Sequence, residues 1–275
     1  MNTMDTIDTI DTSYTNDSMS SEWITTDSVN NNWITNDWIT NNWIVNIEPT
    51  FDNYTYIGYV IFLQFVIYYF IYIVDYIVCK TFGEKARWFQ LHFIINMFVC
   101  IFCINDIIEI VFDVNKSNYQ LTSHLGGSFA LQVHFYHTLN FELTEMDKFH
   151  HISSVFLCFP PSIVFNRKIL SLFYFIGTGL PGGIDYLLLT LVKNNKLHYL
   201  KEKKYNSYLN TYIRMPGGAI CSFLTFNTSI NTNNTFQKLC GMFLSMIAYT
   251  NTAYYGKLAI ENHTERKMQD NIKNK

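Results

Sequence analysis

Residues 88–112 read WFQLHFIINMFVCIFCINDIIEIVF, and apolar or aromatic side chains occupy most of this run. A helix needs about 20 predominantly apolar residues to cross the hydrocarbon core of a bilayer, which is roughly 30 Å thick. The run therefore predicts a transmembrane helix. The composition of the 275-residue chain agrees, because 49% of it is hydrophobic and only 15% is charged, whereas about 25% of the residues of a soluble domain are charged.

Further apolar runs of similar length predict an all-α, polytopic transmembrane helix bundle of about seven spans. The other expected spans are residues 56–79, 125–143, 149–166, 169–192, 208–228 and 236–257. The third, fourth and sixth spans in chain order are short or interrupted by polar residues. We expect a first helix and its basic inner loop in 51–84, a six-helix membrane domain in 85–258 and a charged cytosolic tail in 259–275.

Residues 1–50 differ from the rest, since they contain no Lys or Arg and are rich in Asp, Asn, Thr and Ser. Their Trp-Ile units recur mostly at a period that fits neither a helix nor a strand, so the composition predicts a disordered acidic tail. The alternative is that Trp23, Trp33, Trp38 and Trp43 touch a bilayer interface or a partner. The segment lacks the features of a signal peptide, and we expect the first membrane helix to direct insertion.

The distribution of basic residues predicts the orientation of the bundle. With the N-terminus outside, the inner segments carry 14 Lys and Arg residues and the outer segments carry 4. Because basic residues are enriched in cytosolic loops, we expect an integral multi-pass membrane protein with an outer or lumenal N-terminus and a cytosolic C-terminus.

Residues 145–156, EMDKFHHISSVF, place ionisable groups at the start of an apolar run. Asp147, His150, His151 and Ser154 follow the spacing i, i+3, i+4, i+7, so they share one face of a helix. A charged residue costs roughly 2.5–3.5 kcal/mol at the centre of a membrane helix, and such residues normally face the bundle interior or a watery cavity. The alternative is that they hold helices together by hydrogen bonds worth about 0.6 kcal/mol each.

Polar residues of four other expected spans lie at a similar depth. These residues are His92 and Asn96, His134 and His137, Asp185, and Arg214. Together with the 145–156 segment they predict one polar site in the cytosolic half of the bundle. We assign candidate catalytic roles to His150, His151, Asp147 and Asp185, and candidate substrate-binding roles to Arg214, His134, His137, His92, Asn96 and Ser154.

Glycine and proline interrupt the apolar runs near the same residues. The stretch GTGLPGGIDY precedes and includes Asp185, and RMPGG begins at Arg214. Interrupted spans are tolerated where they line a cavity, although simple bending of the helix is the alternative interpretation. Pro160 and Pro161 are expected to kink or end the fourth span, because proline removes a backbone donor and clashes with the preceding turn.

The motifs DKFHHISS, IDYLLLTLVK and the segment with Arg214 and Pro216 resemble the TLC domain family, which includes the ceramide synthases and the TRAM translocation-associated proteins. The resemblance covers roughly residues 85–258, with one additional helix in front, as in the ceramide synthases. It implies a protein of lipid metabolism or lipid handling in the endoplasmic reticulum. In this resemblance Ser154 occupies the position at which the synthase pattern has Thr. Asp185 occupies the position of one of the aspartates of the pattern, and Leu189 lies near the position of its glutamate.

This resemblance leads to a hypothesis of N-acyl transfer from acyl-CoA to a lipid amine at the cytosolic leaflet. His150 or His151 would take the proton of the nucleophile, a role that contributes about 10² to 10⁴ in rate. Asp147 or Asp185 would orient the imidazole, and Arg214 would hold an anionic headgroup or a CoA phosphate. No cofactor is expected besides acyl-CoA as a co-substrate.

Two other functions are compatible with the same residues. One is a non-catalytic lipid-binding or translocation-associated membrane protein. The other is a His-rich metal-dependent enzyme, since HFYH places His134 and His137 one turn apart, although the repeated H-x-x-H-H boxes of membrane di-iron oxygenases are missing. We expect no metal. Membrane lipids are the expected partners, a homo-oligomer is compatible with the sequence, and no nucleic acid partner is expected.

Overall fold

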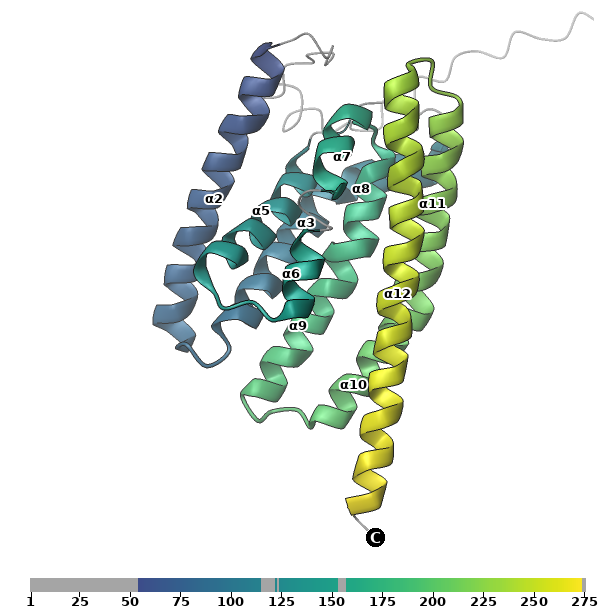
Figure 1. Cartoon of the computed structure of the whole chain (residues 1–275). Helices are drawn as coiled ribbons and strands as arrows, with labels where there is room; N and C mark the ends of the chain where they lie inside the picture. The colour runs from purple at the N-terminus through teal and green to yellow at the C-terminus, as the bar shows by residue number, and fades with distance from the viewer. Residues whose placement is uncertain (1–53, 115–121, 123, 153–156, 274–275) are drawn as a thin grey trace, which may run out of the picture. The chain divides into compact units, whose positions relative to one another are not determined.

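The computed structural model describes residues 54–114, 122, 124–152 and 157–273. Within these residues all regular structure is helical (Figure 1), so the all-α prediction is confirmed. The predicted N-terminal tail, residues 1–50, lies outside the described residues.

The first part of the chain forms α2 (Tyr54–Phe82), α3 (Arg87–Phe112), α5 (Leu125–Asn140), α6 (Glu145–His151), α7 (Phe159–Phe165) and α8 (Ile169–Tyr174). It continues with a π-helical turn η2 (Phe175–Gly179), α9 (Leu180–Lys193), α10 (Tyr199–Leu209), a second π-helical turn η3 (Asn210–Arg214), α11 (Met215–Ile230) and α12 (Thr235–Lys273).

Three helices of the described part are long and apolar enough to cross a membrane. They are Gly58–Phe82 in α2, Arg87–Phe112, which is α3, and Ile169–Lys193, in which α8, η2 and α9 form one continuous rod. Their bounds agree within a few residues with the first, second and fifth expected spans. Among the others, α5 has only 16 residues. The helix α12 has 39 residues and continues through the segment expected as a tail.

The fourth expected span, 149–166, is described on both sides of residues 153–156, which lie outside the described residues. The helix α6 ends at His151, and α7 begins at Phe159 with Pro160 and Pro161 in its first turn. Proline is tolerated at the first helical positions, where the backbone N–H has no intrahelical partner, but not in a helix interior. The proline pair therefore lies where proline is tolerated, at the beginning of α7, and α7 continues past it to Phe165.

Both Gly/Pro stretches contain π-helical turns instead of breaks. The amide of Leu180 donates to the carbonyl of Phe175, and the amide of Met215 donates to the carbonyl of Asn210, five residues earlier in each case. A proline lies two residues after the end of each turn, at Pro181 and Pro216, and the wider turn accommodates the missing backbone donor. The rods continue across these points, and each π-helical turn contributes residues to the cavity described below.

The core lies around α3, which packs against α2, α5, α8 and α9. Its apolar contacts include Ile71 of α2, Leu91, Ile95 and Val99 of α3, and Val133 of α5, each 0% exposed. The same core face of α3 carries His92 and Asn96, both buried. Polar side chains are therefore built into the centre of the bundle.

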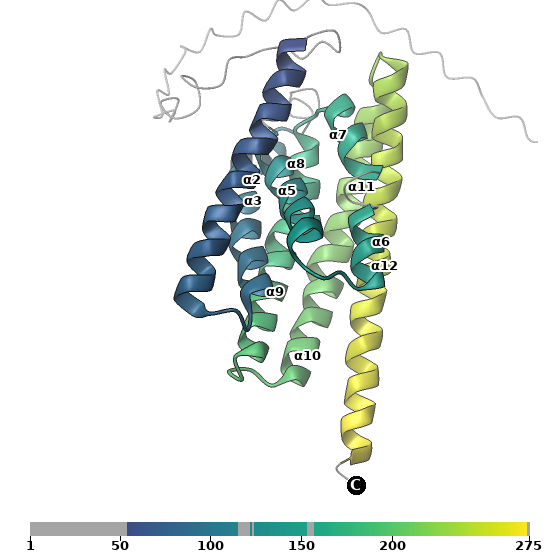
Figure 2. The same ribbon diagram turned by 60° about the vertical axis from the view of Figure 1, so that its left-hand side comes forward.

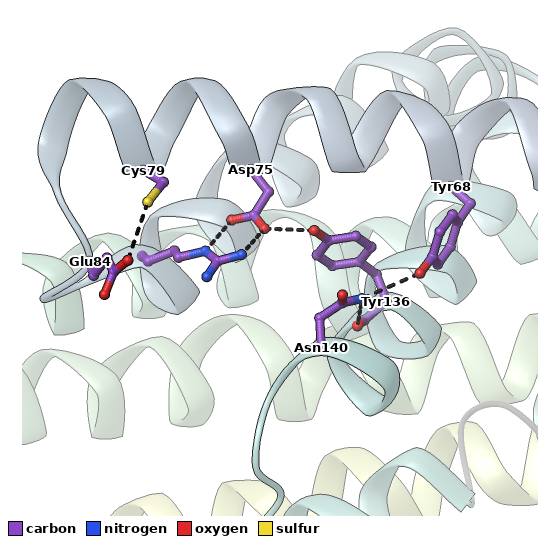
Figure 3. Close-up of polar contacts among 7 residues, drawn as sticks. Tyr68, Asp75, Cys79, Glu84, Tyr136 and Asn140 are labelled. Atoms are coloured by element: carbon purple, nitrogen blue, oxygen red, sulfur yellow. Dashed lines mark hydrogen bonds and ion pairs between the residues drawn. The ribbon is translucent and has the colours of Figure 1, made fainter.

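A network of polar side chains joins α2, α3 and α5 at one end of this core (Figure 3). Asp75 is 2% exposed. Its carboxylate accepts hydrogen bonds from the Arg87 guanidinium, with Nε at 2.7 Å from Oδ1, and from the hydroxyl of Tyr136 at 2.6 Å. The guanidinium also lies over the ring of Phe141, 5.0 Å from its centroid. One carboxylate thus connects three helices.

The helices α11 and α12 run side by side and are joined by small residues (Figures 1 and 2). Ser222 and Ser245 exchange hydrogen bonds across the interface, because each hydroxyl donates to the carbonyl of the other residue at 2.9 and 2.8 Å. Gly218 lies directly against the side chain of Thr252. Small residues and hydroxyl groups are typical of closely packed membrane helices.

We expect Gly218→Ala to destabilise the protein by about 1–3 kcal/mol, the usual effect of overfilling a packed interface. A Cβ at this position would overlap Oγ1, Cγ2 and Cβ of Thr252. The matched control is Gly58→Ala, where a Cβ would meet nothing within 4 Å. Thermal unfolding in detergent should separate the two variants, and an equal melting temperature for both would contradict the close contact.

Candidate functional site

A cavity of about 680 Å³ lies inside the bundle, between α3, α5, α6, α7, the two π-helical turns, α9 and α12. Its polar lining consists of His92, Asn96, His134, Asp147, His150, Ser162, Thr178, Asp185, Tyr186, Arg214, Thr250, Asn251, Tyr254 and Tyr255. Its apolar lining includes Leu131, Phe149, Leu157, Phe159, Leu170, Phe173, Leu244 and Ile247. The cavity is therefore amphipathic, as sites for organic ligands commonly are.

The structure brings most of the candidate site residues to this cavity. Those that line it are His92, Asn96, His134, Asp147, His150, Asp185 and Arg214. His137 and His151 are buried next to His134. The ring centroids of His137 and His151 are 4.8 Å apart, and neither residue lines the cavity. Ser154 lies outside the described residues.

A chain of hydrogen bonds crosses three helices at the histidine end of the cavity. His134 Nδ1 lies 2.5 Å from the carbonyl oxygen of Ala130, one turn earlier in α5. His134 Nε2 lies 3.1 Å from Nε2 of His150 in α6. His150 Nδ1 in turn lies 3.1 Å from the hydroxyl of Tyr255 in α12. Both ring nitrogens of His150 therefore have partners.

The two adjacent histidines of the HH pair have different surroundings. His150 lines the cavity, whereas His151 points between α5 and α6 and bonds through Nδ1 to the hydroxyl of Thr138 at 2.7 Å. That hydroxyl donates to the carbonyl of His134 at 2.8 Å, so it accepts from His151 Nδ1–H. We therefore assign the cavity-facing role to His150 and a supporting role to His151.

His92 and His137 belong to an aromatic cluster behind the cavity wall. The Trp88 ring contacts both imidazoles, and Tyr186 stacks on His92 with centroids 4.3 Å apart. Nε2 of His92 and Nδ1 of His137 are buried without a hydrogen-bond partner among the described residues. These ring contacts join α3 to α5 and α9, and they fix the orientation of the His92 imidazole at the cavity wall.

Asp147 has a structural role in addition to lining the cavity. Its Oδ2 accepts from the amide and the hydroxyl of Thr144, at 3.0 and 2.7 Å, while its own amide donates to Thr144 Oγ1. This reciprocal arrangement is a capping box that begins α6. The ring nitrogens of His150 bond to Tyr255 and His134, and an orienting role of Asp147 or Asp185 toward His150 or His151 stays a prediction.

Arg214 and Asp185 face the cavity with unused hydrogen-bonding capacity. Arg214 Nη1 donates to Asn210 Oδ1 at 3.0 Å, whereas Arg214 Nε and Asp185 Oδ1 are buried without partners among the described residues. Arg214 is the last residue of η3, and Asp185 lies in α9. Buried polar atoms without a hydrogen-bond partner are costly in the empty protein.

Gly182 allows Asn96 and Arg214 to approach α9 closely. A Cβ at position 182 would lie 3.0 Å from Asn96 Nδ2 and 3.9 Å from Arg214 Nη2. The GG sequence of the LPGGIDY stretch therefore leaves room for polar groups of α3 and η3 beside Asp185. These groups form one polar end of the cavity.

Some apolar lining residues reach the outer surface of the bundle. Phe149 is 60% exposed and Leu157 is 48% exposed, although both line the cavity. The cavity therefore opens near α6 and the start of α7. Both helices are short, and α7 packs against α12 (Figure 2).

Two further residues of α3, Cys103 and Asp106, do not line the cavity. Cys103 packs against Gly126. Asp106 accepts from the hydroxyl of Ser171 at 2.5 Å and from that of Thr122 at 3.3 Å. These contacts join α3 to α8 and are consistent with interhelical hydrogen bonding.

In the described residues, no group of three or more His, Cys, Asp or Glu side chains is arranged to hold a metal ion. The imidazoles of His134, His150 and His151 bond to one another, to the carbonyl of Ala130 and to the hydroxyls of Thr138 and Tyr255.

The sequence did not point to several residues of the site. Among them, Tyr255 and Tyr186 line the cavity and Trp88 packs behind it. The chain contains 19 tyrosines, and no pattern distinguishes these two from the others. Trp88 had a usable signal, since it lies in the first turn of α3, four residues before His92 on the same helical face.

No protein-family model, curated protein or solved structure matches the chain. The fold and the cavity define its class: a helical protein with three described helices long and apolar enough to cross a membrane and an internal amphipathic cavity.

Proposed function

We propose that this chain is a multi-span membrane protein of TLC type that binds a lipid in the cavity and transfers an acyl group from acyl-CoA to an amine of that lipid. The observation that carries the proposal is the cavity, in which Arg214 Nε and Asp185 Oδ1 have no hydrogen-bond partner among the described residues, while aromatic and aliphatic side chains line much of the remaining wall. A headgroup fits the first region and an acyl chain fits the second.

The proposed arrangement in the membrane has about seven spans, with the N-terminus outside and the C-terminus cytosolic, in the endoplasmic reticulum. The short α5 and the segment that contains α6 and α7 count as spans that line the cavity. The opening beside Phe149 and Leu157 would face lipid, so the lipid would enter laterally. The polar end of the cavity would lie in the cytosolic half, within reach of acyl-CoA.

Binding is expected to gain free energy from satisfying the unpaired groups. A buried polar group without a partner costs about 1–3 kcal/mol, and more when it is charged. A headgroup that accepts from Arg214 Nε and donates to Asp185 Oδ1 removes both costs. This requirement favours a headgroup with an acceptor and an amine close together.

The acyl transfer itself needs a base at the cavity surface. The amine nitrogen of the lipid forms a bond to the thioester carbonyl carbon, the carbon–sulfur bond breaks, and the amine proton ends on the CoA thiolate. His150 is the histidine of the HH pair that lines the cavity, so it is the proposed site at which a proton is held between attack by the amine and release of the thiolate. His151, His137 and His92 hold the surrounding helices in place.

The test of the proposal begins with Arg214→Gln. We expect binding of a long-chain amine such as sphingosine, or retention of copurified lipid, to fall about 10- to 100-fold, the equivalent of losing a hydrogen bond to a charged group. Native mass spectrometry and lipid extraction of the purified protein measure this. Arg266→Gln is the matched control, because Arg266 is exposed on α12 and bonds only to Gln269 in the described structure.

Acyl transfer is then measured with a labelled acyl-CoA and the same amine. Product formed by the wild type and by Arg266→Gln supports the full proposal. Lipid binding without product would leave a non-catalytic lipid-binding protein. Equal lipid retention by Arg214→Gln and Arg266→Gln would show that the cavity does not bind the headgroup.

A further inference from the structure

We infer that Tyr255 is the group that receives the proton of the substrate, and that His150 and His134 form a relay that takes up the proton Tyr255 releases. The inference rests on the proposed acyl transfer. It is carried by the hydrogen-bond chain from Tyr255 through His150 to His134 and Ala130, which assigns Tyr255 as a catalytic residue.

The backbone carbonyl at the end of the chain determines where the protons lie. A carbonyl oxygen only accepts, so His134 Nδ1 must carry the hydrogen that points at Ala130. In the uncharged imidazole the other nitrogen, Nε2, is then an acceptor. It lies 3.1 Å from His150 Nε2, which must therefore be the donor.

The same reasoning passes through His150 to Tyr255. Because Nε2 of the uncharged His150 carries its hydrogen, its Nδ1 is an acceptor. The partner of this nitrogen is the hydroxyl of Tyr255 at 3.1 Å. The phenol must donate its only hydrogen to His150, and its oxygen keeps acceptor capacity for another group. Tyr255 lines the cavity, so an N–H or O–H of a bound ligand is the group it would accept from.

The proton steps balance as follows. The lipid amine attacks the thioester carbonyl and loses an N–H proton to the Tyr255 oxygen, while the phenol proton moves to His150 Nδ1. His150 is then an imidazolium whose Nε2–H points at the unprotonated Nε2 of His134. When the carbon–sulfur bond breaks, the proton returns from His150 through Tyr255 to the thiolate of CoA, and all three groups regain their first state.

Three separate helices hold this relay in place, which is why no local sequence pattern reveals it. His134 lies on α5, His150 on α6 and Tyr255 on α12, and 105 residues separate His150 from Tyr255. The capping box of Thr144 and Asp147 fixes the start of α6. The helix carrying His150 is thus positioned from its first turn.

The test compares Tyr255→Phe with Tyr249→Phe. Tyr249 is 56% exposed on the same helix and does not line the cavity. With labelled acyl-CoA and sphingosine, Tyr255→Phe should lower kcat about 100-fold, near the lower end of the contribution of a positioned acid or base. The KM for sphingosine should change less than threefold, and Tyr249→Phe should behave as the wild type. A Tyr255→Phe variant with wild-type kcat overturns the inference.

A second measurement is independent of activity. In the detergent-solubilised wild type with ¹⁵N-labelled histidine, nuclear magnetic resonance should show His134 protonated at Nδ1 and His150 protonated at Nε2. Tyr255→Phe should shift the Nδ1 resonance of His150 and leave that of His151 in place. If no acyl transfer occurs but these tautomers are found, the proposed function fails while the hydrogen-bond chain stands. A wild-type His150 protonated at Nδ1 overturns the relay, because Tyr255 would then accept instead of donate.

Discussion

His150→Gln is expected to reduce acyl transfer by about 10² to 10⁴-fold, the contribution of a positioned general acid or base. The effect is large because His150 lines the cavity and joins Tyr255 to His134 through its two ring nitrogens. Glutamine can replace one hydrogen bond but cannot take up and return a proton near neutral pH. Lipid retention should stay within about threefold of the wild type, since Arg214 and Asp185 are unchanged.

His151→Gln is the matched comparison, because it changes the adjacent histidine in the same way. His151 does not line the cavity, and its Nδ1 bonds to Thr138. We expect its loss to reduce transfer less than tenfold and to act through stability. The measurement is the amount of N-acyl lipid product in cells that express each variant at the same yield of folded protein. Equal losses in the two variants would contradict the assignment of different roles to the two histidines.

Long apolar runs predicted the ends of the central helices well. The run 88–112 corresponds to α3, Arg87–Phe112, and 169–192 corresponds to the rod from Ile169 to Lys193. Hydropathy predicted the end of the last helix less well, because α12 continues from the apolar run to Lys273. The residues beyond 257 include Glu, Lys, Arg and Gln, which form helices readily in water. The end of an apolar run therefore does not end a helix.

The polar site could be predicted in part because depth and helical face follow from spacing along the chain. His92, His134, His150, Asp185 and Arg214 come from five different expected spans and line one cavity. Their hydrogen-bond partners could not be predicted, because these depend on packing between distant helices. The serine pair of α11 and α12 and the partner of His150 are examples.

Asp147 shows that a local pattern can be missed beside a more conspicuous one. Thr144 and Asp147 have the spacing of a capping box, S/T-x-x-D/E, directly before the histidine pair. The prediction that Asp147 orients an imidazole was made from the shared helical face alone and did not include this cap. The capping pattern, which requires no tertiary information, indicated where its carboxylate is bound.

Asp75→Ala is expected to destabilise the protein by about 3 kcal/mol, at the low end of the range for breaking a buried ion pair by removing one partner. The carboxylate accepts from Arg87 and from Tyr136, so its loss leaves a guanidinium and a buried hydroxyl without their partner (Figure 3). The Arg87 side chain is 32% exposed, and water can partly replace the lost contact, which keeps the cost from being higher.

The control for this variant is Glu145→Ala, which breaks the ion pair with Lys148. Both side chains are largely exposed, at 88% and 52%, and such surface pairs contribute about 0–1 kcal/mol. Unfolding in mixed micelles, followed by circular dichroism, should therefore separate Asp75→Ala from both Glu145→Ala and the wild type. Because the carboxylate joins α2 to α3 and α5, proteolysis should also cut the α2–α3 connection faster in Asp75→Ala. If the two variants unfold at the same detergent composition, the Asp75 network does not hold α2 on the bundle.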